Sequence, residues 1–375
     1  MKKQKKLNLI GILLGVIFLC SSCTSKKNDT SIPTLKNGIG RDFLIGVAIT
    51  PHQVSMKDSI AMKLVSEQFN CISPENCMKS ENIHPEENYY YWDMADQYVN
   101  FGVKHNMFVI GHCLIWHSQL SPWFCVDKNG NNVSPEVLKK RIKNHITTIV
   151  SRYQGQVNGW DVVNEALLDD GSYRNSKFYQ ILGEEFIPFA FKCAHEADPK
   201  AELYYNDYSM TLPAKQKGVL HIVKTIRDYG APITGIGMQS HYNITGPSAE
   251  EVQTAIDTLA KTGCKLMITE LDLSALPFPE NLSGAGVEQD QEYLAKYNPY
   301  PESLPDSAQT AWNNQIKSYF DVFKANKDKI SRITVWGLTD SLSWRNNWPI
   351  QGRRDYATLF DRHYKAKEFT KTLMK

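Results

Sequence analysis

The sequence has almost no excess of charge of either sign, with 42 Lys and Arg residues against 40 Asp and Glu residues. This balance removes the electrostatic case for nucleic-acid binding, which needs a basic surface. The sequence also lacks a glycine-rich phosphate-binding turn after its first expected strand, which argues against a doubly wound dinucleotide-binding sheet. Apart from Cys20 and Cys23 near the N-terminus, its cysteines follow no zinc-binding spacing. With 42% hydrophobic residues, the chain can nevertheless build one large core.

The N-terminus carries an apolar run, Leu7–Leu19, that is too short to span a bilayer comfortably. Lysines precede this run, and Cys20 and Cys23 follow it. The arrangement resembles a bacterial lipoprotein signal, which implies a signal peptide over 1–22 and a lipid anchor on Cys23. Cys20 stands where Leu is usual, so a signal cleaved without lipidation is the alternative. The resemblance predicts an exported cell-envelope lipoprotein, held to a membrane on the periplasmic side or at the cell surface.

Residues 23–38 are polar and have no apolar periodicity, so we interpret them as a flexible tether. The folded domain is expected to span 39–375. Exported proteins can form disulfides, but isolated cysteines in apolar runs are usually small core residues. This interpretation applies to the six that remain, namely Cys71, Cys77, Cys113, Cys125, Cys193 and Cys264.

Short apolar runs then alternate with longer segments of helical periodicity. The expected strands are Phe43–Ile49, Gln68–Pro74, Met107–Trp116, Val157–Ala166, Glu202–Asn206, Thr234–His241, Lys265–Leu273 and Ile333–Leu338. The expected helices are Lys57–Glu67, Trp92–His105, Pro135–Tyr153, Ser176–Ala197, Ala214–Tyr229, Ser248–Thr262, Ser307–Asn326 and Lys365–Leu373. This alternation without an interrupting linker predicts the α/β class and a single-domain (β/α)8 TIM barrel. The long connection Pro277–Asp306 is expected to form a structured loop beside the barrel mouth.

Two of the expected strands run into a glutamate. The segment Val157–Leu167 reaches Asn164 and Glu165, and Lys265–Leu273 reaches Glu270. The carboxyl ends of barrel strands form the mouth where chemistry takes place, so two such acids can face each other there. A capping or salt-bridged glutamate is the ordinary explanation for one such residue. The repetition of the pattern favours a catalytic pair.

The other expected strand ends carry amides, imidazoles, carboxylates and indoles. Paired donors and acceptors suit vicinal sugar hydroxyls, and an indole face suits the C–H face of a pyranose. A sugar cleft is therefore predicted from Glu75, Asn76, Lys79, His112, Trp116, Gln119, Asn164, Glu165, Asn206, Asp207, Gln239, His241, Glu270, Asp272, Trp336, Trp344 and Arg345.

Seven segments of the sequence together resemble the family ten glycoside hydrolases, the endo-1,4-β-xylanases. The resemblance covers the chain from about Ile39 to Phe360, and its segments occur in order. Any one of them alone would be weak. They are Phe69–Lys79, Gly111–Phe124, Trp160–Leu167, Leu203–Tyr208, Gly235–His241, Ile268–Leu273 and Val335–Arg345.

The resemblance implies that Glu165 is the general acid/base and Glu270 the nucleophile of a retaining double displacement. The chemistry requires the same division, with one protonated and one ionised carboxyl group. The family likeness places His241 against Glu270, oriented in turn by Asp272. It also implies that Asn164 holds the 2-hydroxyl of the sugar being cleaved.

Further residues match the family's sugar contacts. Glu75, Asn76 and Lys79 resemble binders of the non-reducing-side sugars, whereas His112 and Trp116 resemble walls of the cleavage subsite and Trp336 and Trp344 its roof. Gln119, Asn206, Gln239 and Arg345 complete the expected substrate-binding set. A satisfied core histidine is the alternative for His112, and Trp123 is expected to be structural. Ser80 and Cys77 depart from the family, which affects the outer non-reducing subsite.

The sequence thus predicts a monomeric enzyme that hydrolyses xylan and xylo-oligosaccharides and needs no cofactor or metal. Three alternatives stay open. The same site could prefer β-1,4-glucan, although the C6 hydroxymethyl of glucose needs additional room. A catalytically silent glycan-binding lipoprotein would tolerate loss of either glutamate. A metal-dependent barrel hydrolase would need clustered histidines and carboxylates around an open coordination position.

Overall fold

The computed structural model describes residues 33–278 and 294–375. The expected signal peptide, the expected lipidation residue Cys23 and residues 279–293 of the long connection lie outside the described residues. Residues Pro33–Lys375 form one compact unit. Within the described ranges, no helix is both long and apolar enough to cross a membrane.

Eight parallel strands form a closed ring. In ring order they are β1 (Leu44–Ile49), β2 (Cys71–Pro74), β3 (Phe108–Trp116), β4 (Gly159–Asn164), β5 (Glu202–Asp207), β6 (Gly235–Met238), β8 (Lys265–Ser274) and β9 (Ile330–Val335). Strand β9 returns to pair with β1, which closes the ring. The predicted (β/α)8 TIM barrel is therefore confirmed.

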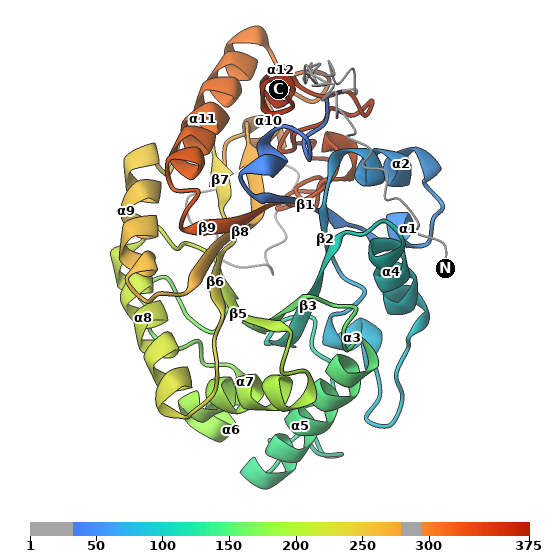
Figure 1. The fold of residues 1–375 in the computed structure, drawn as a ribbon, viewed down its shortest axis with the longest axis vertical. Coiled ribbons are helices and arrows are strands. Elements are labelled where there is room, and N and C mark those ends of the chain that lie inside the picture. The colour runs from blue at the N-terminus through green and yellow to red at the C-terminus, as the bar shows by residue number, and fades with distance from the viewer. Residues whose placement is uncertain (1–32, 279–293) are drawn as a thin grey trace, which may run out of the picture. The chain divides into compact units, whose positions relative to one another are not determined.

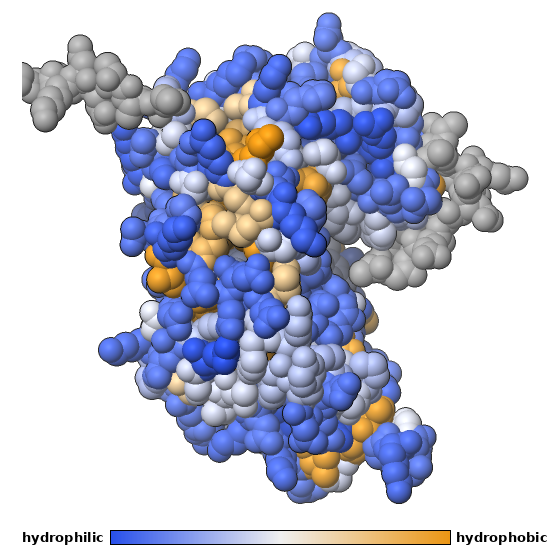
Figure 2. All heavy atoms as spheres, turned by 90° about the vertical axis from the view of Figure 1, so that its right-hand side faces the viewer, coloured by the Kyte–Doolittle hydropathy of each residue, from blue (hydrophilic) through white to orange (hydrophobic). Residues whose placement is uncertain are grey.

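The helices lie outside this ring, with the strands in the middle (Figure 1). They are α1 (Pro51–Val54), α2 (Ser59–Gln68), α3 (Ser80–Ile83), α4 (Asp93–Lys104), α5 (Pro135–Arg152), α6 (Lys177–Leu182), α7 (Phe186–Ala197), α8 (Pro213–Asp228), α9 (Ala249–Ala260), α10 (Leu294–Tyr297), α11 (Asp306–Ala325) and α12 (Glu368–Leu373). Short 3-10 turns occur at η1 (Ile39–Arg41), η2 (Gly183–Glu185) and η4 (Asp340–Leu342). The face that α1, α2 and α4 present is largely hydrophilic (Figure 2).

Two expected elements are each divided in the structure. The strand predicted over Thr234–His241 becomes β6 and a separate β7 (His241–Asn243), because Ser240 has a φ of 65° and interrupts the extended chain. The helix predicted over Ser176–Ala197 becomes α6 and α7, because Gly183 ends α6 with a φ of 59°. Both β6 and β7 pair with β8, so the division carries His241 along β8 to the level of Asp272.

The folded unit was expected to begin at Ile39, but in the structure it begins earlier. Leu35 is fully buried, and its backbone N–H donates to Oε1 of Gln68 at 3.0 Å. The expected tether is therefore too long at its C-terminal end. The six cysteines predicted as core residues are all buried and free, which confirms that interpretation.

Large side chains fill the interior of the barrel. Cys71, Ile110, Tyr204 and Met267 form a buried cluster there, and a Cβ atom at Gly159 would lie 2.3 Å from the hydroxyl of Tyr204. Close packing of this kind makes even one added methyl group costly. The ring is thus a packed core, and the space for a ligand is at the carboxyl ends of its strands.

Candidate active site

Glu165 directly follows the last residue of β4. Its φ of 55° is in the left-handed region, so the chain turns out of the sheet at the barrel mouth. The indole Nε1 of Trp116 donates to Oε2 of Glu165 at 2.9 Å, and Nε2 of Gln239 donates to Oε1 at 2.9 Å. Side chains from β3 and from the end of β6 thus hold both carboxylate oxygens.

Glu270 lies within β8 and is only 5% exposed. Nδ2 of Asn206 donates to its Oε1 at 2.7 Å, and Nε2 of His241 donates to its Oε2 at 3.1 Å. Burial by itself raises the pKa of Glu270, but the hydrogen bond from His241, the charges of His112 and His241 and the bond from Asn206 outweigh it and lower the pKa. The carboxylate is therefore held in its ionised form.

A continuous set of amide hydrogen bonds joins the two glutamates. Nδ2 of Asn206 donates both to Glu270 and, at 2.8 Å, to Oδ1 of Asn164. Nε2 of Gln239 donates to the same Oδ1 at 3.4 Å and to Glu165. The strand-end acids, which are far apart in the sequence, are therefore connected through Asn164.

His241 lies between two carboxylates. Its Nδ1 donates to Oδ2 of Asp272 at 2.9 Å, while its Nε2 binds Glu270. Burial opposes protonation of the imidazole, but Asp272 and then Glu270 outweigh it and raise the pKa of His241 to about 9. His241 is thus an imidazolium at neutral pH.

Asp272 is itself held by the segment that follows β9. Nε1 of Trp344 donates to its Oδ2 at 2.7 Å, and Nε of Arg345 donates to its Oδ1 at 2.8 Å. Burial by itself raises the pKa of Asp272. The charges of Arg345 and His241 and the hydrogen bonds from these residues outweigh burial, so the pKa of Asp272 lies below its ordinary value.

The structure changes the interpretation of three residues that the sequence grouped with the sugar contacts. Asn206 is fully buried, Gln239 is buried, and Arg345 is 6% exposed. Their side chains donate to the carboxylates described above, and Asn206 and Gln239 also donate to Oδ1 of Asn164. They therefore support charged groups of the site instead of lining an open surface.

The residues expected at the non-reducing side do come together. Nζ of Lys79 donates to Oδ1 of Asn76 at 3.0 Å and to Oε1 of Gln119 at 2.7 Å, and it lies 4.7 Å from the ring centroid of Trp116. Nδ2 of Asn76 donates to Glu75 at 3.3 Å, and burial raises the pKa of that carboxyl group. This polar cluster adjoins Glu165 through the indole of Trp116.

His112 is buried and has a hydrogen-bond partner, Asp161, that sequence reasoning missed. Its Nδ1 donates to Oδ2 of Asp161 at 2.8 Å, and its ring meets that of Trp336 edge-on at a centroid distance of 5.3 Å. Asp161 faces His112 directly in the pairing of β3 with β4. A carboxylate in the middle of a buried strand is the signal that could have identified it.

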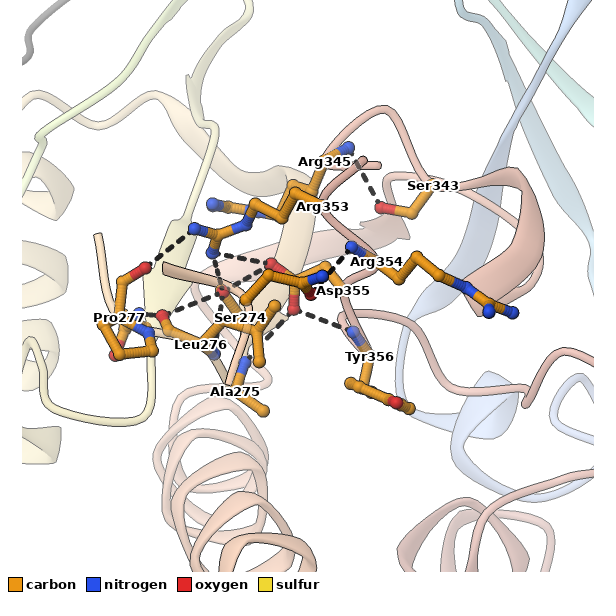
Figure 3. A network of polar contacts seen from close by, with 12 residues as sticks. Ser274, Ala275, Leu276, Pro277, Ser343, Arg345, Arg353, Arg354, Asp355 and Tyr356 are labelled. Atoms are coloured by element: carbon orange, nitrogen blue, oxygen red, sulfur yellow. Dashed lines mark hydrogen bonds and ion pairs between the residues drawn. The ribbon is translucent and has the colours of Figure 1, made fainter. Parts of the chain in front are cut away.

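A second missed group lies behind the segment that carries Trp344. Arg353 forms a buried ion pair with Asp355 at 3.1 Å and donates to the carbonyl oxygen of Pro277 at 2.7 Å. Ser274, the last residue of β8, donates to Asp355 at 2.5 Å (Figure 3). This network connects the end of β8 to the segment after β9, whose Trp344 and Arg345 bind Asp272.

Aromatic rings extend from this segment. The centroids of His241 and Trp344 are 5.1 Å apart, those of Trp344 and Trp348 4.8 Å, and those of Trp348 and Phe278 5.1 Å. The sequence identified Trp344 but neither Trp348 nor Phe278. In the parts of the chain that the structure describes, no three His, Cys, Asp or Glu side chains are grouped so as to hold a metal ion.

Comparison with known proteins agrees with this geometry. The model of glycosyl hydrolase family 10 matches residues 34–375. The chain belongs to glycosyl hydrolase family 10. It is 46% identical over 343 residues to endo-1,4-beta-xylanase A of Xylanibacter ruminicola, covering 92% of this chain and 93% of that protein. It is 37% identical to an endo-1,4-beta-xylanase of Geobacillus stearothermophilus, covering 90% and 97%.

Solved structures show the same family 10 architecture. A family 10 endoxylanase retrieved from a sugarcane soil metagenome superposes with a TM-score of 0.86 at 38% identity, covering 92% of this chain and 99% of that one. A xylanase of Paenibacillus barcinonensis complexed with a conduramine derivative gives a TM-score of 0.82 at 33% identity, covering 92% and 99%.

Ser80 and Cys77, the two expected departures from the family pattern, lie under the surface of this family 10 member. The hydroxyl groups of Ser80 and Ser121 are 2.8 Å apart and hydrogen-bonded, and both residues are buried. Cys77 is also buried, and burial raises the pKa of its thiol to about 12. Both side chains are therefore buried beside the residues Glu75, Asn76 and Lys79, to which they are adjacent in the chain.

Proposed function

We propose that this hydrolase is an endo-1,4-β-xylanase that cleaves internal bonds of the xylan backbone with retention of anomeric configuration. The observation that carries the proposal is the hydrogen-bonded connection of Glu165 to Glu270 through Gln239, Asn164 and Asn206. Retaining enzymes need two carboxyl groups about 5–5.5 Å apart, and this connection gathers the two acids at the same end of the barrel. The xylanase relatives at up to 46% identity support the substrate.

In the first step, the carboxylate of Glu270 attacks the anomeric carbon while Glu165 gives its proton to the departing glycosidic oxygen. A covalent glycosyl-enzyme forms and the bond to the leaving sugar breaks. In the second step, Glu165 takes a proton from water, whose oxygen attacks the anomeric carbon and releases Glu270. Two inversions at the same carbon return the original configuration.

The charged His241 serves this sequence by keeping Glu270 ionised before attack. Asn206 donates to Oδ1 of Asn164, which leaves Nδ2 of Asn164 to donate to the 2-hydroxyl of the sugar. A bond of this kind strengthens as the ring gains oxocarbenium character. Lys79, Asn76 and Glu75 offer donors and acceptors for the sugar beyond the cleaved one.

The test of this function is incubation of the purified protein with xylan. New reducing ends are expected, and NMR at early times should show β-anomers as the first products. A Glu270→Ala variant should lose activity. Inverted products, or an active Glu270→Ala variant, would contradict the proposal. Faster hydrolysis of an aryl cellobioside than of the matching aryl xylobioside would assign the site to glucan instead.

We also propose that the enzyme is an exported lipoprotein anchored through Cys23. The support is the lysine-rich start, the apolar run Leu7–Leu19 and the cysteine that follows it. Radiolabelled palmitate should enter the wild-type protein in bacterial cells and should not enter a Cys23→Ala variant. Equal labelling of the two proteins would exclude the anchor.

A further inference from the structure

The chain makes a constrained turn directly after β4. Glu165 has a left-handed φ of 55°, which side chains with a Cβ rarely adopt unless the surroundings enforce it. Its N–H still follows the ladder and donates to the carbonyl oxygen of Asn206 at 2.9 Å. Its own carbonyl oxygen accepts from Nε of Arg174 at 3.2 Å. Beyond Glu165, the backbone needs partners that the sheet no longer supplies.

Side chains from β5 and α8 supply these partners. The hydroxyl of Tyr205 accepts from the N–H of Ala166 at 3.2 Å, and Oδ2 of Asp207 accepts from the N–H of Leu167 at 3.3 Å. Nζ of Lys215 donates to the carbonyl oxygen of Leu167 at 2.9 Å. Three side chains thus hold the two residues that follow the general acid.

These three side chains are also bonded to one another and are fully buried. Nζ of Lys215 lies 2.8 Å from Oδ1 of Asp207, and both side chains are 0% exposed. The hydroxyl of Tyr205 donates to Oδ2 of Asp207 at 2.5 Å. Burial raises the pKa of Asp207 to about 6, although Lys215 and Tyr205 oppose this increase.

An ion pair buried this deeply is poor evidence of a gain in stability, because desolvation offsets much of the attraction between the charges. The ion pair is better explained by its effect on backbone conformation, because the pair and the hydroxyl of Tyr205 together fix three backbone groups of one turn. That turn sets the direction in which the Glu165 side chain leaves the barrel wall.

We propose that Tyr205, Asp207 and Lys215 form a clamp that positions Glu165 for proton transfer. They are positioning residues, because they form hydrogen bonds with the backbone of Ala166 and Leu167 and with one another. The proposal rests on the general-acid role assigned to Glu165 under the proposed function.

The test uses the dependence of proton transfer on the leaving group. A 2,4-dinitrophenyl xylobioside departs without a proton, whereas a 4-methylphenyl xylobioside needs one. Tyr205→Phe removes one oxygen atom from the clamp, and Lys215→Met removes its cation. Tyr98→Phe is the matched control, because Tyr98 is equally buried and its hydroxyl donates to the carbonyl oxygens of Ile72 and Ile110, away from the acid.

Positioned general acids contribute about 10²–10⁴-fold, so loss of the clamp is expected to lower kcat/KM on the 4-methylphenyl substrate by about tenfold or more. The value on the dinitrophenyl substrate should change by less than about twofold, and Tyr98→Phe should not discriminate between the substrates. Equal losses on both substrates in Tyr205→Phe, or no loss on either, would overturn the clamp.

Glu165→Ala separates failure of this inference from failure of the proposed function. If Glu165→Ala discriminates between the two leaving groups and Tyr205→Phe does not, the acid role stands and the clamp is wrong. If the wild-type protein hydrolyses neither xylobioside, or Glu165→Ala loses both activities equally, the proposed function fails and the clamp fails with it.

Discussion

Nε2 of His241 lies 3.1 Å from Oε2 of Glu270, and this one hydrogen bond couples the charge of the imidazole to that of the nucleophile. The same ring binds Asp272 through Nδ1, so the imidazolium is shared between two carboxylates. The arrangement keeps a buried acid ionised in a place where burial alone would favour its protonated form. Several measurable consequences depend on it.

The first prediction concerns the acid limb of the pH–activity profile. His241→Ala removes the hydrogen bond and the charge that lower the pKa of Glu270, while the effect of burial, which raises this pKa, persists. Glu270 should therefore need a higher pH to ionise, and the acid limb of kcat/KM should move to higher pH. A pH series with an aryl xylobioside measures this shift, and an unchanged limb would contradict the assigned role.

The second prediction concerns stability against pH. The pKa of His241 is raised to about 9 in the folded protein from an ordinary value near 6.5. The stabilisation from its protonation is therefore complete below about pH 6.5 and is lost as the pH rises to about 9. Urea titrations should show the free energy of unfolding falling more steeply over this range for the wild type than for His241→Gln. Parallel curves would show that the imidazole is not an imidazolium.

The third prediction concerns Arg345, whose guanidinium neutralises the buried Asp272 at 2.8 Å. Arg345→Met removes the guanidinium and leaves His241 and Trp344 as the partners of the buried carboxylate. The free energy of unfolding should therefore fall by about 3 kcal/mol, the lower end of the range for a broken buried ion pair. Lys63→Met is the control, because the 3.8 Å pair of Lys63 with Glu67 is exposed, and its loss should cost about 0–1 kcal/mol. Chemical denaturation of the two variants measures both values, and equal losses would count against a structural role for Arg345.

The fourth prediction concerns Lys79, which lies in the polar cluster beside Trp116. Hydrogen bonds to charged groups are worth about 1.5–3 kcal/mol, so Lys79→Met should lower kcat/KM on an aryl xylobioside about 10- to 100-fold. An aryl xyloside has no sugar on the non-reducing side of the cleaved one, so its hydrolysis should change much less. Steady-state kinetics with both substrates make the comparison, and matching losses would remove Lys79 from that sugar's binding site.

The barrel and the two glutamates were predictable because both follow from local patterns. Buried parallel strands are continuous apolar runs in the sequence. An acid at the end of such a run can be recognised without knowing which strands lie beside it. The divided strand at Ser240 was not predictable, because the left-handed φ of a serine leaves no trace in hydrophobic periodicity. The ends of elements were correspondingly less accurate than their existence, as the early start of the fold at Leu35 shows.

Several charged residues of the interior were missed, although His241 and Asp272 were identified. Asp161, Arg353 and Asp355 are charged side chains in the interior, where the partner decides whether burial is tolerated. Those partners lie on other strands or loops, so the pairing is a property of the fold. Asn206 and Arg345 were identified as polar residues of the site, and the structure adds that each donates a hydrogen bond to a carboxylate.

The amino-acid sequence by itself determined the alternation of strands and helices, the parallel barrel and the chemical types of side chain at its mouth, because each depends on residues close together along the chain. Only the tertiary structure decided which donor meets which carboxylate, that His241 is charged and that Glu270 is ionised. Those outcomes depend on distances of about 3 Å between residues from different strands and on the loss of water around them, which only the closed barrel sets.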